Sequence, residues 1–155
     1  MFLIFLLLTG CCLISVTQGA GGKNDTSSDP CGVTGSWVNE LGSGMELTCQ
    51  ADSTSVISGS LSGRYNSAVG HAKDFYKISG RYARSGTKLE NCIVGFTVAY
   101  NNDVHGNSNS TASFTGNYFS FDDTIYTHWI LVYHTQPGNM WLNSNMGKNI
   151  FKRQH

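Results

Sequence analysis

TGSWVNELGS, residues Thr34 to Ser43, has the alternating pattern of a β-strand near the start of the chain. Side chains in a strand alternate between its two faces, so every second residue shares a face. One face would carry Trp37, Asn39, Leu41 and Ser43. A face used only for packing would be apolar throughout, whereas this one includes an amide and a hydroxyl group. Such a mixture is typical of the wall of a ligand pocket with a few polar groups. An ordinary first hairpin with incidental polar residues is the alternative interpretation.

Seven further segments rich in Val, Ile, Thr, Tyr and Phe follow, and Gly, Asn or Ser separates them. Segments of this composition are predicted strands, and no stretch of the sequence has the 3.6-residue period of a helix. Eight successive strands separated by turns predict an all-β fold, an eight-stranded antiparallel up-and-down β-barrel. The seven segments are Met45 to Ala51, Val56 to Tyr65, Asp74 to Ala83, Cys92 to Asn101, Ser110 to Ser120, Thr124 to His134 and Gly147 to Lys152.

Residues 1–20 form an apolar run that closes with small residues, the pattern of a secretory signal peptide that is removed from the mature protein. A membrane anchor is the alternative, but polar residues interrupt the run before it reaches the roughly 20 apolar residues of a membrane span. We therefore expect cleavage between Gly19 and Gly22, an extracellular protein and no membrane partner. A flexible leader would follow at 21–30, and one barrel domain at 31–155. N-glycosylation acceptors at Asn24 and Asn109 fit the secretory route.

The composition argues against several classes of function. Ten basic and ten acidic residues give a formal net charge of zero, and no basic stripe indicates a nucleic-acid partner. The histidines have no Cys or Glu neighbours at the spacing of a zinc site. The Gly-x-Ser-x-Gly motif of serine hydrolases is absent from the sequence. The sequence therefore predicts a protein that is not an enzyme, with no catalytic residue, no metal site and no cofactor.

Five cysteines become three if Cys11 and Cys12 leave with the signal peptide. In a secreted protein the simplest arrangement of Cys31, Cys49 and Cys92 is one disulfide and one free thiol. The residues alone leave the pairing open.

Six segments, taken in order, carry a resemblance to a known family. They are TGSWVNELGS (34–43), SGRYNSAVGHA (62–72), GFTVAY (95–100), SFTGNY (113–118), HWILVY (128–133) and MWLNSNMGKNIF (140–151). Each is weak alone, but together they resemble the avidin and streptavidin family of biotin-binding barrels over residues 32–151. The resemblance implies a homotetramer that binds biotin without catalysis in the open end of the barrel.

The resemblance also implies a set of hydrogen bonds to the ureido ring of biotin. Its oxygen would accept bonds from Asn39, Ser43 and Tyr65, and three donors on one carbonyl oxygen favour negative charge on that oxygen. Its two N–H groups would donate to Ser67 and Asn149. Asparagine at the last position matches the egg-white type of the family, whereas streptavidin has a carboxylate there.

The rest of the ligand would meet the pocket walls and its mouth. By resemblance, the carboxylate of biotin would bind the backbone N–H groups of a lid at Gly70 and His71 and the hydroxyl of Ser110. Trp141 matches the loop tryptophan that reaches into the pocket of a neighbouring subunit. The apolar walls would be Leu41, Val69, Tyr100, Phe114, Trp129 and Leu131.

Three positions depart from the bacterial family pattern. Tyr100 and Phe114 replace tryptophans, and Ala112 replaces a threonine near the sulfur of the ligand. One lost neutral hydrogen bond costs ~1 kcal/mol, and a smaller aromatic ring removes another ~1 kcal/mol of apolar contact. We therefore expect an affinity on the order of tenfold to a few hundredfold below the extreme of the family.

The cysteines depart from the family as well. Cys31 matches the first cysteine of the egg-white disulfide, but the position of its partner holds Tyr118. The resemblance therefore favours a Cys31–Cys92 pair, because Cys92 shares its strand face with inward-facing residues. A Cys49–Cys92 pair is the rival.

Two other kinds of protein compete with this interpretation. Gly35-Ser36-Trp37 also fits the opening Gly-x-Trp motif of lipocalins, which carry other small ligands. Lipocalins are longer and end with a helix, and the polar inner face of the first strand favours a compact, hydrogen-bonding ligand. An avidin-like barrel that does not bind biotin is the second alternative.

Overall fold

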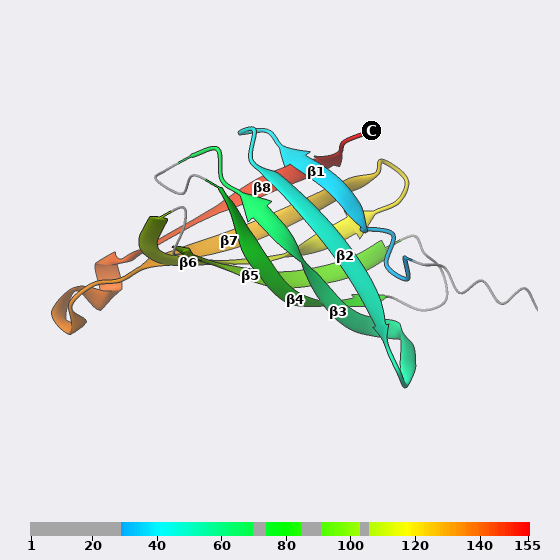
Figure 1. The fold of residues 1–155 in the computed structure, drawn as a ribbon, viewed down its shortest axis with the longest axis horizontal. Coiled ribbons are helices and arrows are strands. Elements are labelled where there is room, and N and C mark those ends of the chain that lie inside the picture. The colour runs from blue at the N-terminus through cyan, green and yellow to red at the C-terminus, as the bar shows by residue number, and fades with distance from the viewer. Residues whose placement is uncertain (1–28, 70–73, 85–90, 103–105) are drawn as a thin grey trace, which may run out of the picture.

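Eight antiparallel strands close into one barrel in the computed structural model, which describes residues 29–69, 74–84, 91–102 and 106–155 (Figure 1). Each strand pairs with the next one along the chain, and β8 pairs with β1 to complete the ring. The predicted all-β, up-and-down barrel is therefore confirmed. The predicted signal peptide, most of the predicted leader and the glycosylation acceptor at Asn24 lie outside the described residues.

All eight predicted strands are present in the predicted order. Three of their ends differ clearly from the prediction: β1 stops at Asn39, β6 starts at Gly106 rather than Ser110, and β8 starts at Ser144 rather than Gly147. The strands are β1 (Gly35–Asn39), β2 (Gly44–Asp52), β3 (Ser55–Asn66), β4 (Phe75–Arg84), β5 (Asn91–Asn102), β6 (Gly106–Phe119), β7 (Thr124–Tyr133) and β8 (Ser144–Arg153).

The end of β1 corrects the prediction that one strand runs to Ser43. The side-chain oxygen Oδ1 of Asn39 accepts hydrogen bonds from the backbone N–H groups of Leu41 (3.0 Å) and Ser43 (2.8 Å). These bonds turn the chain, since asparagine side chains stabilise turns by binding backbone groups two or more residues ahead. Leu41 consequently lies in the turn and is 52% exposed, rather than on the inner face of a strand.

The closed end of the barrel is filled around Trp37, which has no exposed surface. The Nε1 of Trp37 donates to the carbonyl oxygen of Val33 at 2.9 Å. The guanidinium carbon of Arg153 lies 4.2 Å from the centre of the Trp37 ring, a cation–π contact. Arg153 also donates to the carbonyl oxygens of Gly32 and Thr34. Trp37 therefore packs the floor of the barrel and does not line the cavity.

A disulfide joins Cys31 to Cys92, with the two Cα atoms 5.8 Å apart. It ties the segment before β1 to the start of β5, where Cys92 lies opposite Tyr118 on β6. Cys92 thus lies on β5, directly beside the β6 position, Tyr118, where the family resemblance places the partner of Cys31. Cys49 is a buried free thiol, and burial raises its pKa to about 12, so it stays protonated at neutral pH. The favoured pairing is confirmed, and the rival Cys49–Cys92 pair is wrong.

The segment between β7 and β8 projects from the open end of the barrel (Figure 1). It contains a 3-10 helix, η1 (Pro137–Leu142), where the sequence predicts only a loop. Its apolar side chains have no burial partner within the described chain: Met140 is 55% exposed, and Trp141 and Leu142 are each 87% exposed. In the described residues, we find no helix long and apolar enough to cross a membrane.

Candidate ligand-binding site

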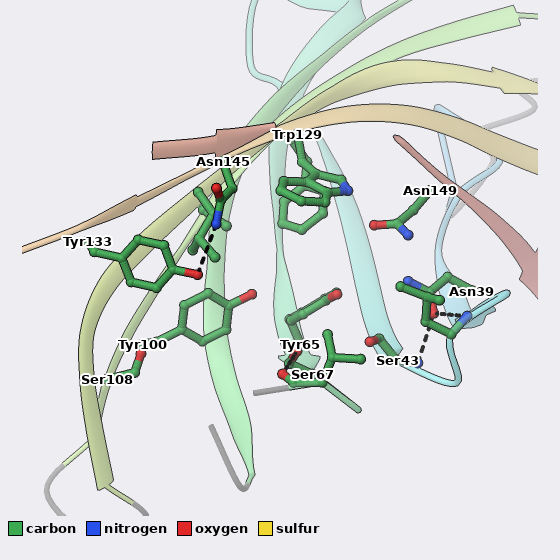
Figure 2. A pocket seen from close by; sticks show the side chains of 15 residues that line it. Asn39, Ser43, Tyr65, Ser67, Tyr100, Ser108, Trp129, Tyr133, Asn145 and Asn149 are labelled. Atoms are coloured by element: carbon green, nitrogen blue, oxygen red, sulfur yellow. Dashed lines mark hydrogen bonds between the residues drawn. The ribbon is translucent and has the colours of Figure 1, made fainter. Parts of the chain in front are cut away.

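A cavity of about 630 Å³ lies in the barrel at the end away from Trp37 (Figure 2). This volume is within the range of small-molecule sites. Eleven of the residues proposed for the site line it, and they come from both ends of the sequence and from most of the strands. They are Asn39, Leu41, Ser43, Tyr65, Ser67, Val69, Tyr100, Phe114, Trp129, Leu131 and Asn149.

Of the four other proposed residues, Ser110 and Trp141 are described and do not line the cavity. Gly70 and His71 lie outside the described residues. Ser110 has no paired residue on β5, because the pairing of β5 with β6 is irregular there. Its hydroxyl is hydrogen-bonded at 2.6 Å to that of Ser108, which lines the cavity instead. Trp141 is largely exposed and does not line the cavity of its own chain.

Sequence reasoning missed three polar residues at the cavity: Ser108, Tyr133 and Asn145. The signal for two of them was present, because strand alternation continues from Trp129 through Leu131 to Tyr133 and from Asn149 back to Asn145. The predicted strand that starts at Gly147 excludes Asn145, whereas Tyr133 lies within the predicted strand Thr124 to His134 and could have been found by alternation. Ala112, one of the departures from the family pattern, also lines the cavity.

Asn39 presents a hydrogen-bond donor to the cavity. The residue is 6% exposed, and its Oδ1 is engaged by the two backbone N–H groups of the turn. Its Nδ2 is buried and has no hydrogen-bond partner among the described residues. A buried donor without a partner is costly, so this amide nitrogen is placed to bind an acceptor on a ligand.

Ser43 and Tyr65 lie beside Asn39 and can also act as donors (Figure 2). The Oγ of Ser43 accepts a bond from the N–H of Ala68 at 3.0 Å, which leaves its own proton to point elsewhere. Burial raises the pKa of Tyr65; the hydroxyl of Ser43 opposes this effect, and the negative charge of Glu40 adds to it. Tyr65 therefore keeps its proton at neutral pH and can donate it.

Ser67 and Asn149 have the opposite hydrogen-bonding sense, because their protons already have acceptors within the protein. The hydroxyl of Ser67 donates to the carbonyl oxygen of Val69 at 2.7 Å. The Nδ2 of Asn149 donates to Oε1 of Glu40 at 2.8 Å. Each of the two residues is left with an oxygen that can accept a hydrogen bond from a ligand.

Glu40 holds Asn149 in place from the turn after β1. Its second oxygen, Oε2, accepts the backbone N–H of Ile150 at 2.8 Å, so the carboxylate bridges two adjacent residues of β8. Burial alone would raise the pKa of Glu40, but the bonds from Ile150 and Asn149 outweigh that effect and hold the pKa below its usual value. Glu40 is therefore ionised at neutral pH and acts as an acceptor for both groups.

Between the polar groups the cavity has aromatic walls. Phe114 packs against Tyr65, with ring centroids 5.4 Å apart, and stacks on Phe96 behind it at 4.9 Å. Tyr100 packs edge-on against Tyr65, and burial is the main cause that raises the pKa of Tyr100, so it too is neutral. The Nε1 of Trp129 is buried without a hydrogen-bond partner among the described residues.

The cavity as a whole is neutral and matches a compact polar ligand with an apolar body. No Asp, Glu, Lys, Arg or His side chain of the described residues lines it. We also find no group of three or more His, Cys, Asp and Glu side chains in the described residues that could hold a metal ion. The site can therefore bind and orient a neutral ring through three donors and two acceptors.

Comparison with known proteins agrees with this architecture. A family model described as the avidin family matches residues 27–154. The chain is also similar to avidin-related protein 2 of Gallus gallus, with 29% identity over 133 residues, which covers 83% of this chain and 82% of the relative. The chain belongs to the avidin family.

Proposed function

We propose that this protein binds biotin, without catalysis, in the open end of its barrel. The observation that carries the proposal is the set of five polar groups that line one cavity. The Nδ2 of Asn39 is a donor without a partner among the described residues, the hydroxyls of Ser43 and Tyr65 can donate, and Ser67 and Asn149 are acceptors whose protons are bound within the protein. A cyclic urea needs this set, because its oxygen accepts up to three bonds while each of its two N–H groups donates one. The groups are Asn39, Ser43, Tyr65, Ser67 and Asn149.

The apolar parts of the site suit the rest of the ligand. The bicyclic ring of biotin would lie between Phe114, Trp129 and Leu131, with Tyr100 along the aliphatic chain. Ala112 lines the cavity but has no hydroxyl to donate to the sulfur. This supports a biotin affinity on the order of tenfold to a few hundredfold below the extreme of the family.

We further propose that the protein is secreted and assembles as a homotetramer in which Trp141 completes the pocket of a neighbouring subunit. An exposed indole ring in a 3-10 helix at the barrel mouth supports this role. The outer face of β7 and β8 also exposes apolar side chains, and large exposed apolar patches mark interaction surfaces. They include Ile130, Val132, Met146 and Ile150, each more than 40% exposed.

Isothermal titration of the mature protein with biotin tests the proposal. Binding should release heat and raise the unfolding temperature as the concentration of biotin increases. The absence of both effects at saturating biotin would show that the barrel serves another ligand or a structural role.

An isosteric variant tests the donor role directly. Asn39→Asp keeps the oxygen that accepts the two N–H groups of the turn, but it replaces the donor Nδ2 with a negatively charged oxygen. We expect a loss of about 2 kcal/mol in binding, roughly 30-fold in Kd, with the barrel still folded. Asn117→Asp, on the exposed face of β6, is the matched control and should bind normally.

A further inference from the structure

An acceptor sequence for N-glycosylation lies at the rim of the cavity. Asn109-Ser110-Thr111 is one of two Asn-x-Ser/Thr sequences in the chain, and the other begins at Asn24. Only the first lies in the part of the chain that the structure describes, near the start of β6. An oligosaccharide on an asparagine is bulky and stays on the surface. Its place beside the cavity would therefore decide what can reach the ligand site.

The backbone of Asn109 adjoins two residues that line the cavity. Ser108 precedes it in the chain and lines the cavity on the same side as Tyr133 (Figure 2). The carbonyl oxygen of Asn109 accepts the N–H of His134, the residue after Tyr133, at 2.7 Å. Tyr133 itself is 40% exposed although it lines the cavity, so it marks the rim. Asn109 is therefore held at the rim, between the start of β6 and the end of β7.

The conformation of Asn109 suits a glycosylated residue. Asn109 is exposed, whereas Ser108 and Ser110 on either side are half-buried and are bonded to each other at 2.6 Å. Its φ of 48° lies in the left-handed region, which asparagine adopts more readily than most other residues. The pairing of β5 with β6 is irregular at this point. Since glycosylated asparagines belong to exposed, loop-like backbone, the folded barrel can accommodate an oligosaccharide here.

We propose that Asn109 carries an N-linked oligosaccharide that screens the mouth of the cavity, so that the site takes free biotin and excludes biotin attached to a macromolecule. This inference rests on the proposed function, secretion included. Free biotin is small enough to pass an oligosaccharide that is fixed to one side of the mouth. Biotin joined to a protein brings the surface of that protein up to the rim, where it meets the sugar. The oligosaccharide thus selects by the size of what is attached to the ligand.

Protein secreted from insect cells tests the proposal, with Asn24→Gln in every version so that Asn109 is the only acceptor. The intact mass before and after treatment with peptide N-glycosidase F shows whether Asn109 carries an oligosaccharide. Association rates are then measured with free biotin and with biotinylated serum albumin. We expect the glycosylated protein to bind the albumin at least about tenfold more slowly than a version without the oligosaccharide, because fewer orientations of the albumin allow entry. Free biotin should associate with both at the same rate.

Thr111→Ala supplies the version without the oligosaccharide. It removes the acceptor sequence but keeps Asn109, which the left-handed backbone favours. Thr111 is exposed on β6, opposite Ala99 and Val132, so the barrel should still fold. Thr115→Ala is the matched control, because this threonine is also exposed on β6 but lies outside the acceptor sequence. It should stay glycosylated and bind the albumin as slowly as the unaltered protein does.

The outcomes separate this inference from the function on which it rests. Absence of an oligosaccharide from Asn109 would overturn the inference, and so would equal rates of albumin binding by the glycosylated protein and by Thr111→Ala. In both cases the binding of free biotin would leave the proposed function intact. If folded Thr111→Ala binds neither free biotin nor the albumin, the proposed function itself fails.

Discussion

Replacing Glu40 with alanine should weaken biotin binding, although Glu40 does not line the cavity. In the present structure its carboxylate receives the Nδ2 of Asn149 and the N–H of Ile150, both at 2.8 Å. Without Glu40 the amide of Asn149 can rotate and present its NH₂ group to the ligand in place of its oxygen. One neutral hydrogen bond to the ligand is then lost, which costs about 1 kcal/mol, or roughly fivefold in Kd. The carboxylate is largely exposed, so solvent screening argues against a larger effect.

The dependence on pH gives a second readout for the same residue. The folded protein holds the pKa of Glu40 below its usual value, so the ionised form stabilises the site above the usual pKa of a glutamate. This contribution disappears as the pH falls through the lowered pKa. The difference in affinity between the unaltered protein and Glu40→Ala should therefore be constant from pH 6 to pH 8 and shrink below about pH 4.

Displacement titration at pH 7 measures this effect, and two variants serve as controls. Glu40→Gln keeps one oxygen that can accept from Asn149, so it should lose less affinity than Glu40→Ala. Glu46→Ala removes another surface glutamate, bonded to Arg64 on the outside of the barrel, and should not change the affinity. Unchanged binding by Glu40→Ala at pH 7 would refute the view that Glu40 orients Asn149.

Three further substitutions test other parts of the structure. Gly147→Ala places a Cβ atom 2.5 Å from Cζ2 of Trp129, so it should displace that ring, lower biotin affinity about tenfold and shift tryptophan fluorescence; an unmoved spectrum would contradict this. Changing both Cys31 and Cys92 to serine opens a link across 61 residues and should lower the free energy of unfolding by about 2–4 kcal/mol in denaturant titrations, while biotin still binds the folded fraction. Trp141→Ala should weaken biotin binding and loosen assembly together in titration and size-exclusion experiments; no change in either would show that its proposed role across subunits is wrong.

The strands and the inward-facing residues could be predicted because both depend on local alternation. The pattern that marks Trp37 and Asn39 as one face needs only the period of a strand. The same rule predicted too long a β1. Alternation alone does not show that the side chain of Asn39 accepts backbone hydrogen bonds and so ends the strand. Turn formation by a single amide competes with strand propensity, and composition does not reveal which prevails.

The interactions that give the site its hydrogen-bonding sense were not predictable from local patterns. Glu40 and Asn149 are separated by 109 positions in the chain and meet only when β8 closes against β1. Ser108, and not Ser110, lines the cavity, at a point where the pairing of β5 with β6 is irregular, and nothing in the serine-rich sequence marks that irregularity. It is therefore easier to predict which residues line the site than to predict which of them donate hydrogen bonds and which accept them.

The bonds of Arg153 to Gly32 and Thr34 have a practical consequence for the use of this barrel. They fasten the beginning and the end of the domain to each other at the sealed base, and the Cys31 bridge holds the same region. A fluorescent protein or a surface anchor joined after Arg153 would therefore emerge from the base and leave the mouth clear. Molecules immobilised in this way should stand with their cavities facing the solution.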